Sequence, residues 1–500
     1  MVPAALRWRS VVGSLVAAGR RRLSTVFALS SGHGRCGVAV IRVTGPASAD
    51  ALRALTGGRS LPAARRAVVR RLFSPCDGAL LDRALLLWLP GPASFTGEDC
   101  CELHTHGGPA VVAAVLRALA AVPGLQPARP GEFTRRAFHA GKLDVTQVEG
   151  LADLLAAETE QQRRQAVRQA EGHLRRQYSR WRAALLRCLA TAEAFIDFGE
   201  EELIEEDAMA ETVAAADRLA DDMRRHLADG RRGERLRSGV QVTIAGAPNA
   251  GKSSLLNGLV QREAAIVSEV PGTTRDLLDA TLDVAGFPVV LTDTAGLRDA
   301  SDAVEREGVR RARGSAAAAD LVLLVAEAPR VLFWMGGPGV ARTADVFVSE
   351  QLSALGLGAG TESPPPETQL VLNKVDLVSE AEVERLGDWC RSAPGRTALV
   401  SCLTGHGVAA LVEALGDSLG RLCADAAAPA PALTRQRHRL HVAGAERHVR
   451  QFIAQVAAGG DLALAAEQLR LAARQIGELT GHVGAEEILD VIFSDFCIGK

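Results

Sequence analysis

The sequence predicts a multidomain α/β and α protein: a small α+β domain, then an all-α helical domain that contains an inserted α/β domain. Three observations support this fold class. The chain has 500 residues, which is too many for a single hydrophobic core. Five apolar runs alternate with helical stretches in its second half, as in a parallel sheet. Segments of helical periodicity lie on both sides of these runs.

The N-terminal domain is predicted over residues 24–143. The runs VFALSS, GVAVIRVTG and ALLLWLPGP are typical of strands. GPASADALRALTGG and GGPAVVAAVLRALAAVPG are typical of helices, and the second begins after Gly-Gly-Pro and ends at Pro-Gly. Strands and helices together indicate a small α+β domain.

The helical domain is predicted in two parts, residues 144–238 and 424–500. The first part has no proline and carries apolar residues at helical spacing. The second part follows the linker-like APAPALTRQ and is again rich in Ala, Leu, Arg and Glu. Between them, residues 239–423 contain the runs VQVTIAG, FPVVLTDTAG, DLVLLVAEA, QLVLNKVD and TALVSCLTG, each a candidate buried parallel strand.

The composition excludes several classes of protein. The net charge is only −2, so the chain as a whole is not a basic nucleic-acid binder, and any RNA contact would come from local patches or shape. No apolar run has the length of a membrane span. The nine cysteines form no CxxC pair, which favours reduced, mostly buried thiols over a zinc site or a disulfide framework.

Residues 1–23 differ from the rest of the chain. They are rich in arginine, and no acidic residue appears before Asp50. A basic, amphipathic segment without carboxylates is typical of a mitochondrial transit peptide. The alternative is an ordinary basic tail.

A phosphate loop follows the first strand of the inserted domain. VQVTIAG leads into GAPNAGKS, residues 246–253, and the helical SLLNGLV follows, which is the strand–loop–helix setting of the GxxxxGKS motif. The glycines let backbone N–H groups converge on anionic oxygens, Lys252 adds positive charge, and the Ser253 hydroxyl ligates Mg²⁺. The predicted contacts of this loop are Asn249, Ala250, Gly251, Lys252, Ser253 and Ser254.

Two further motifs fit a guanine-nucleotide switch. PGTTRD offers a threonine hydroxyl to the metal. In DTAG the aspartate ends a strand and holds the water shell of the metal, while the glycine amide senses the γ-phosphate. The predicted contacts of these motifs are Thr273, Thr274, Asp293, Thr294, Ala295 and Gly296.

The NKVD motif, residues 373–376, predicts selection of guanine. Asp376 can accept hydrogen bonds from guanine N1–H and the 2-amino group, for which adenine has no equivalent donors. Backbone N–H groups at Ser401 and Cys402 would support the base oxygen. With Asn373 and Lys374, these residues predict a Ras-like P-loop GTPase domain that binds GTP; the alternative is an ATPase or an inactive remnant.

The residue that follows DTAG is Leu297, which cannot orient an attacking water as a glutamine does in many GTPases. Positive charge between the β- and γ-phosphates must then come from elsewhere. A monovalent cation bound by Asn249 and loop carbonyls would supply it. Asn249, through this cation, and Lys252, through its own charge, are therefore predicted to act in catalysis.

The motifs resemble those of the MnmE (TrmE) tRNA-modification GTPases. The matching segments are GAPNAGKSSLLN, EAAIVSEVPGTTRD, DTAGLRDASDAVEREG, NKVD, the N-terminal GPASFTGEDCCELHTHGGP and RPGEFTRRAFHAGKLDVTQVEGLADL, and the terminal FCIGK. The likeness runs from about Ser24 to Lys500, and the arginine-rich leader resembles the mitochondrial branch of the family.

The resemblance implies a K⁺-dependent GTPase whose hydrolysis depends on dimerisation. It implies that Glu305 positions the attacking water indirectly and that Ser253 and Thr274 bind Mg²⁺. The implied K⁺ ligands are Asn249, Ser268, Val270 and Thr273.

The resemblance also implies that the N-terminal domain binds a tetrahydrofolate derivative of the 5-formyl or 5,10-methylene type. Its implied contacts are Arg42, Glu102, Lys142 and Lys500. Cys497 would lie beside this pocket, in a packing role or as a nucleophile.

The implied partners are a second copy of the chain, an MnmG/GidA-like FAD-dependent protein and mitochondrial tRNA. Together they would modify C5 of the wobble uridine, of the 5-taurinomethyluridine type, in the mitochondrial matrix. The alternative is a GTP-switched ribosome-assembly or RNA-binding factor without a catalytic role in modification. A folate pocket separates the two, because an assembly factor has no need of one.

Overall fold

The computed structural model describes two compact units. One holds the described residues up to Ala152 together with those from Thr480 onward, and the other spans Asp153–Leu479. Among the described residues no helix is both long enough and apolar enough to cross a bilayer. The description covers residues 24–32, 34–198, 206–262, 264–265, 279–293, 319–337, 342–354, 367–391, 397–423, 432–481, 489–490, 492–493, 496 and 498–500.

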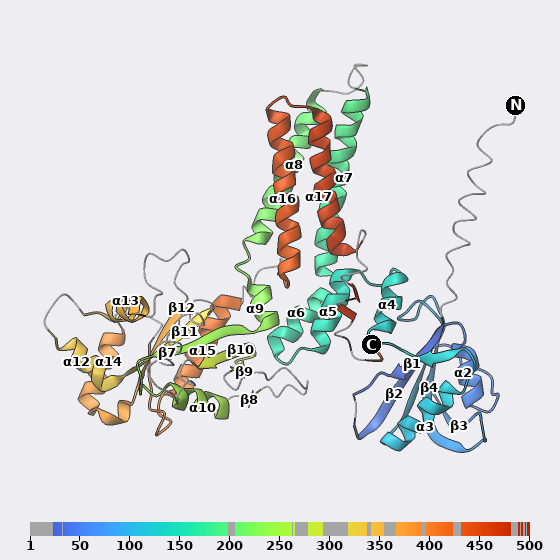
Figure 1. The fold of residues 1–500 in the computed structure, drawn as a ribbon, viewed down its shortest axis with the longest axis horizontal. Coiled ribbons are helices and arrows are strands. Elements are labelled where there is room, and N and C mark those ends of the chain that lie inside the picture. The colour runs from blue at the N-terminus through green and yellow to red at the C-terminus, as the bar shows by residue number, and fades with distance from the viewer. Residues whose placement is uncertain are drawn as a thin grey trace, which may run out of the picture. The chain divides into compact units, whose positions relative to one another are not determined.

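The first unit is built on a six-stranded sheet in the order β3-β4-β5-β2-β1-β6 (Figure 1). Neighbouring strands are antiparallel except for β1 and β6. The predicted strands are confirmed as β1, β2 and β4, and three more join them. The strands are β1 (Thr25–Leu29), β2 (Cys36–Thr44), β3 (Val68–Phe73), β4 (Leu80–Leu89), β5 (Cys100–Gly107) and β6 (Leu125–Pro127).

Helices α2 (Ser48–Leu55) and α3 (Pro109–Ala120) confirm the two predicted helices and share one apolar core with the sheet. Pro109 opens α3, where its missing N–H leaves no helical bond unmade. Leu55 and Leu119 are fully buried in this core.

The C-terminal segment belongs to the first unit. Helices α4 (Glu132–His139) and α5 (Val145–Leu155) follow the sheet. Most of α5, which the sequence assigns to the helical domain, lies in the first unit because its apolar face is covered by the end of the chain. The residues of this cluster are Val145, Val148, Leu489, Ile492, Phe493 and Phe496.

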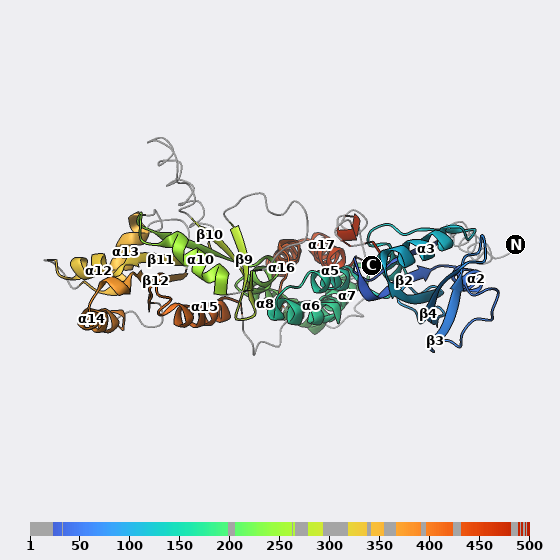
Figure 2. The same ribbon diagram turned by 90° about the horizontal axis from the view of Figure 1, so that it is seen from below.

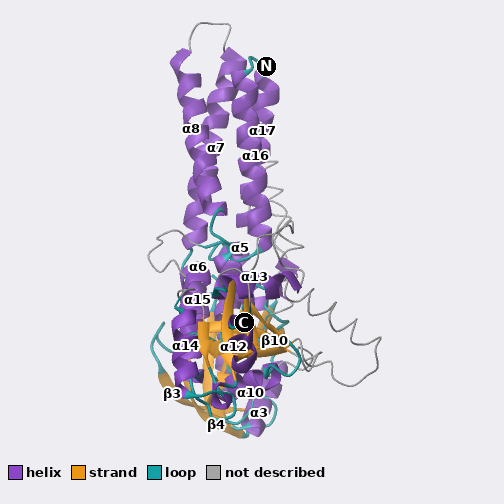
Figure 3. Cartoon of the chain, turned by 90° about the vertical axis from the view of Figure 1, so that its left-hand side faces the viewer, coloured by secondary structure: helices purple, strands orange, loops and turns teal. Residues whose placement is uncertain are grey.

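Four long helices form the helical body of the second unit (Figure 3). Two precede the inserted domain and two follow it, so neither half has a complete core without the other. The bulky Tyr178, Trp181 and Phe452 are buried at their centre. The helices are α7 (His173–Phe198), α8 (Glu206–Leu227), α16 (Gln436–Ala457) and α17 (Leu462–Thr480).

The inserted domain is a seven-stranded sheet in the order β13-β12-β11-β7-β10-β9-β8. All five apolar runs are confirmed as its parallel strands, and β8 and β9 extend it in antiparallel fashion. The strands are β7 (Val240–Gly246), β8 (Ala264–Ala265), β9 (Asp279–Val284), β10 (Phe287–Asp293), β11 (Leu321–Glu327), β12 (Glu367–Asn373) and β13 (Thr397–Leu399).

Helices lie against this sheet (Figure 2). Their side chains pack with it in two separate apolar cores. Helices α10 (Lys252–Arg262) and α15 (Val408–Cys423) pack in one core. Helices α12 (Ala328–Met335), α13 (Ala344–Ala354) and α14 (Glu380–Cys390) pack in the other. The carboxyl ends of the parallel strands lie at one edge of the sheet, where α/β folds bind ligands.

The entry and exit of the inserted domain are held side by side. The Leu433 N–H donates to Asp229 Oδ2 at 3.0 Å. In helix α9 (Arg232–Ser238), a Cβ on Gly233 would lie 2.3 Å from the Leu433 carbonyl oxygen, so only glycine fits there. Near the start of helix α6 (Glu160–Ala170), the Gln161 N–H donates to the Gly286 carbonyl of the β9–β10 turn at 3.1 Å.

Candidate functional site

The phosphate loop runs from the end of β7 to the start of α10, as predicted. Its backbone needs residues without bulk: a Cβ on Gly246 would lie 2.1 Å from the Val325 carbonyl oxygen, and one on Gly251 would lie 2.1 Å from Asn373 Nδ2. Asn249 has φ 65°, a left-handed conformation that asparagine tolerates better than most residues. This curvature turns successive backbone N–H groups toward the same side.

Lys252 is the first residue of α10, and its side chain folds back along the loop. Its Nζ donates to the carbonyls of Gly246 at 3.0 Å and Ala247 at 2.9 Å. The next two residues, Ser253 and Ser254, are exposed in the first turn of the helix. An ammonium group, hydroxyls and the positive end of a helix thus meet at one place, which suits the phosphates of a nucleotide.

Asn373 joins the phosphate loop to the loop after β13. Its side chain is 3% exposed. Nδ2 donates to the Ala250 carbonyl at 2.9 Å, and Oδ1 accepts from the Cys402 N–H at 3.1 Å. One side chain therefore fixes the spacing between two loops from distant parts of the sequence.

Asp376 lies beside the same loop. Ser401 Oγ donates to Asp376 Oδ1 at 2.5 Å, which orients the carboxylate. Burial raises the pKa of the Cys402 thiol, so Cys402 presents a neutral side chain beside this loop. The structure brings together Asn373, Asp376, Ser401 and Cys402. The backbone N–H groups of Ser401 and Cys402, which the sequence predicts as donors to the base oxygen, instead donate to the His406 carbonyl at 3.0 Å and to Asn373 Oδ1, because the loop closes on itself.

Lys374 has φ 65°, and its Nζ pairs with Glu327 Oε1 at 2.6 Å. Glu327 is the last residue of β11 and lies opposite Asn373 in the strand register. Glu327 is not among the residues predicted from the sequence. The available signal was its place at the carboxyl end of a buried strand beside the NKVD strand.

Several predicted site residues lie outside the described residues. Asp293 ends β10 and pairs through its backbone with Ile244 of β7, as its motif predicts. The predicted residues outside the description are Ser268, Val270, Thr273, Thr274, Thr294, Ala295, Gly296, Glu305 and Cys497.

The first unit holds a second polar site on its sheet. Arg42 of β2 faces Glu102 of β5 in register, and its Nη2 and Nε donate to Glu102 Oε1 at 2.9 and 3.1 Å. Both side chains are partly exposed, at 20% and 16%. The guanidinium carbon lies 5.7 Å from the ring centroids of both Phe95 and Phe133. His104 Nε2 lies 3.3 Å from the other Glu102 oxygen.

The C-terminus is tied to the edge of this site. The Phe133 N–H donates to the Lys500 carbonyl at 3.2 Å, so the residue whose ring faces Arg42 also holds the chain end. Ser30 Oγ donates to the Gly499 carbonyl at 2.8 Å. Lys142 lies beside Gly97, in the same loop as Phe95. Contacts thus connect Arg42 and Glu102 with Lys500, and the loop of Phe95 with Lys142.

Arg136, which is not among the residues predicted from the sequence, holds the loop that carries Phe95. It is 7% exposed and donates to Glu98 at 3.0 Å, to Glu132 at 2.7 Å and to the Ser24 carbonyl at 2.7 Å. Glu98 also accepts from Thr44 Oγ1 at 3.1 Å. A buried guanidinium with three acceptors fixes the segment that carries Phe95.

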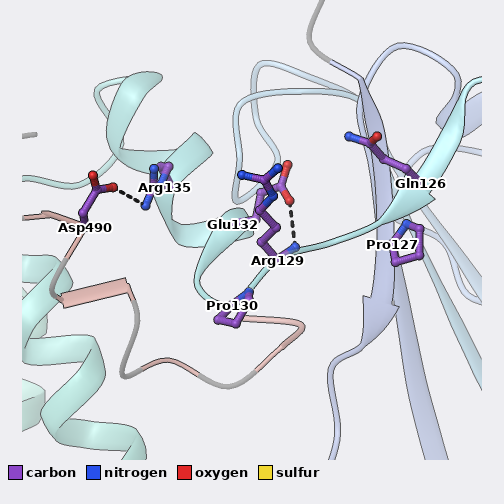
Figure 4. Close-up of a pocket in the computed structure, with 7 residues that line it drawn as sticks. All are labelled: Gln126, Pro127, Arg129, Pro130, Glu132, Arg135 and Asp490. Carbon is purple, nitrogen blue, oxygen red and sulfur yellow. Dashed lines mark hydrogen bonds and ion pairs between the residues drawn. The ribbon is translucent and has the colours of Figure 1, made fainter.

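A shallow polar pocket lies next to the segment that holds the C-terminus (Figure 4). Arg135 pairs with Asp490 at 2.7 Å, and the Arg129 N–H donates to Glu132 at 2.9 Å. Pro130 forms a bridge with Ile498. The Arg135–Asp490 pair and the Pro130–Ile498 bridge thus join this pocket to the end of the chain.

Comparison with known proteins identifies one family along the chain. The model of the MnmE helical domain matches residues 145–497, and that of the GTP-binding protein TrmE N-terminus matches residues 25–142. The mitochondrial 5-taurinomethyluridine tRNA synthase subunit GTPB3 of Danio rerio is 52% identical over 478 residues, which cover 95% of this chain and 93% of that protein.

Two further relatives are similar to this chain over nearly its whole length. The Homo sapiens protein of the same name is 51% identical over 483 residues, covering 95% of this chain and 93% of its own. The tRNA modification GTPase MnmE of Parvibaculum lavamentivorans is 50% identical over 478 residues, covering 96% of this chain and 100% of its own. The chain therefore belongs to the MnmE/TrmE family of tRNA modification GTPases.

Proposed function

We propose that this chain is a K⁺-dependent, dimerisation-activated GTPase of the mitochondrial matrix that modifies C5 of the wobble uridine of mitochondrial tRNAs. It would act with an FAD-dependent partner and a tetrahydrofolate one-carbon donor, in a reaction of the 5-taurinomethyluridine type. The names of the relatives support the modification and the compartment. The observation that carries the GTPase assignment is the Asn373 bridge beside Asp376.

The base side of the site suits guanine. The Asp376 carboxylate, with one oxygen held by Ser401, would accept from guanine N1–H and the 2-amino group. The Cys402 N–H is already engaged by Asn373, so its role is to hold the loop that carries the Ser401 contact. This arrangement favours GTP over ATP because adenine presents no matching pair of donors.

The phosphate side suits a nucleotide with its metal ions. Lys252 and the first turn of α10 would bind the β- and γ-phosphates, where negative charge develops during hydrolysis. Mg²⁺ would be held by Ser253 and Thr274. K⁺, held by Asn249, Ser268, Val270 and Thr273, would supply positive charge between the phosphates, and Glu305 would position water. The left-handed Asn249 lies within the loop that the phosphates need, which fits this role.

The polar site of the first unit fits a reduced folate. The two phenylalanine rings beside Arg42 offer flat apolar surface to a pterin ring, and Glu102 can accept from its amino and ring N–H groups. Arg42 or one of the lysines, Lys142 or Lys500, would pair with the acidic groups of the folate. The bound folate would supply the one-carbon unit, while these residues bind and orient it.

Calorimetry tests the folate assignment and separates the two candidate functions. The full chain is expected to bind 5-formyltetrahydrofolate, and Arg42→Ala is expected to weaken binding at least tenfold, since a charge-assisted pair is worth about 1.5–3 kcal/mol. Arg53→Ala is the matched control, because Arg53 makes a similar ion pair with Asp50 at 2.9 Å on the exposed face of α2. A wild-type chain that binds no folate would favour the assembly-factor function.

Two measurements test the dependence of GTP turnover on K⁺ and the modification of tRNA. GTP turnover by the purified chain is expected to be much faster in K⁺ than in Na⁺; equal rates would contradict the cation assignment. Mass spectrometry of mitochondrial tRNA from cells that lack the protein is expected to show unmodified wobble uridines. Fully modified wobble uridines would refute the proposed reaction.

A further inference from the structure

The Lys374–Glu327 ion pair links two neighbouring strands at the nucleotide-binding edge. Lys374 follows β12 directly, and Glu327 is the last residue of β11. Their Nζ and Oε1 atoms are 2.6 Å apart, and the side chains are 32% and 20% exposed. The pair is thus partly desolvated, which makes it stronger than a fully exposed pair.

The groups around this pair belong to the predicted base site. Asn373, which precedes Lys374, bridges the phosphate loop and Cys402, while Asp376 follows two residues later and is held by Ser401. Glu327 also lines a cavity of about 1010 Å³, together with Ala247 of the phosphate loop and residues of α12. Because Lys374 lies between Asn373 and Asp376 in the chain, the ion pair adjoins the predicted base site.

We propose that Glu327 is a positioning residue for guanine-nucleotide binding: it holds the Lys374 side chain extended across the strand ends. This inference rests on the proposed GTPase function. A free lysine side chain samples many rotamers, and fixing it on binding opposes affinity. With its Nζ held by Glu327, the alkyl stem of Lys374 is already ordered and offers a flat apolar surface to a purine ring.

The proposal predicts a specific pattern of affinities. Glu327 acts on the base side, and GDP and GTP carry the same base. Replacing it should weaken both nucleotides by the same factor. A residue that acted on the γ-phosphate would weaken GTP alone. At saturating nucleotide the turnover number should stay near that of the wild type while KM rises.

The test compares Glu327→Gln with a matched control in the full chain. Kd for GDP and for a non-hydrolysable GTP analogue is expected to rise about fivefold to tenfold in Glu327→Gln, in the range of the net contribution of one partly exposed hydrogen bond. The control is Glu367→Gln. Glu367 begins β12, pairs with Arg421 at 2.9 Å and is 14% exposed, at the opposite end of the strands. Its loss should leave both affinities unchanged.

A double-mutant cycle shows whether Glu327 acts through the lysine. In a Lys374→Met background, Glu327→Gln should cause no further loss of affinity. Glu327→Asp keeps the charge and should bind GDP more tightly than Glu327→Gln does; equal binding by the two variants would count against an ion pair.

The outcomes separate this inference from the function on which it rests. Unchanged GDP affinity in Glu327→Gln, a loss confined to the GTP analogue, or an equal loss with and without Lys374 would each overturn the proposal. A wild-type chain that binds neither nucleotide would instead overturn the GTPase function.

Discussion

The Asn373 bridge gives the sharpest quantitative prediction. Asn373→Ala removes two hydrogen bonds, of 2.9 Å to the Ala250 carbonyl and 3.1 Å from the Cys402 N–H. The side chain is 3% exposed, so water cannot easily replace it. Each bond contributes about 1 kcal/mol net, and a group left unpaired costs about 1–3 kcal/mol. The expected total is about 2–4 kcal/mol.

This loss should appear in nucleotide affinity. Without the bridge, the phosphate loop and the loop of Cys402 are ordered together only when a nucleotide holds them, so binding must supply the ordering free energy. The Kd for a fluorescent GDP analogue is expected to rise about 30-fold or more, which corresponds to 2 kcal/mol. Titration of the full-length variant measures it directly.

The same strand offers a matched control. Gln369 is 1% exposed, and among the described residues its side-chain nitrogen and oxygen have no hydrogen-bond partner. Gln369→Leu keeps a similar volume and removes two unsatisfied polar atoms, so its melting temperature should be equal or higher. Its GDP affinity should stay within about twofold of the wild type. An Asn373→Ala chain that binds GDP as tightly as Gln369→Leu would refute the reasoning.

Three further predictions follow. Asp376→Asn should weaken GTP and admit xanthosine nucleotides, measured by competition binding; unaltered GTP affinity would contradict the base assignment. Asn249→Ala should abolish K⁺ stimulation of turnover while nucleotide affinity is mostly kept. Asn249→Gly, which suits the left-handed backbone without strain, should behave in the same way. Retained stimulation in both variants would exclude the asparagine as a K⁺ ligand. Burial lowers the pKa of His226 to about 4, so the folded state binds fewer protons than the unfolded state, and stability should fall as pH drops from about 6.5 toward 4, by about 2 kcal/mol at pH 5. Thermal melts at pH 7 and pH 5 should show a smaller pH-dependent loss for His226→Gln, and an equal loss would disprove the assignment.

The strands that the sequence predicts are those with runs of aliphatic residues, which include β1, β2 and β4 of the first unit. Strands β7 and β10–β13 form the parallel part of the inserted sheet, and they appear in the sequence as continuous apolar runs. Strand β5, CCELHTHG, and strand β9, DATLDV, alternate polar and apolar residues and contain few aliphatic side chains. Their strand conformation depends on pairing with neighbours, which a single sequence does not reveal.

The site residues also fall into two groups: those in contiguous motifs, which the sequence predicts, and those that depend on distant partners, which it does not. The phosphate loop and NKVD are contiguous, so residue type and spacing predict them before any folding is known. Glu327 and Arg136 act through partners that are distant in sequence. Strand register brings Glu327 next to the NKVD strand, and burial under a loop brings Arg136 to Glu98. The pairing of Arg42 with Glu102 likewise depends on the register of β2 and β5, and the family resemblance implied the two residues as folate contacts without implying their pairing.

The insertion also sets an order of events during synthesis. Helices α7 and α8 emerge from the ribosome first, with Tyr178 and Trp181 still uncovered, and their partners α16 and α17 follow only after the inserted domain is made. At cellular translation rates this interval lasts on the order of ten seconds or longer, a period in which the two nascent helices are natural clients for chaperones. The inserted domain is contiguous and can fold meanwhile. Because its two ends adjoin, the folded inserted domain brings α16 close to α8. The chain then closes a short loop between these helices instead of one as long as the whole insertion.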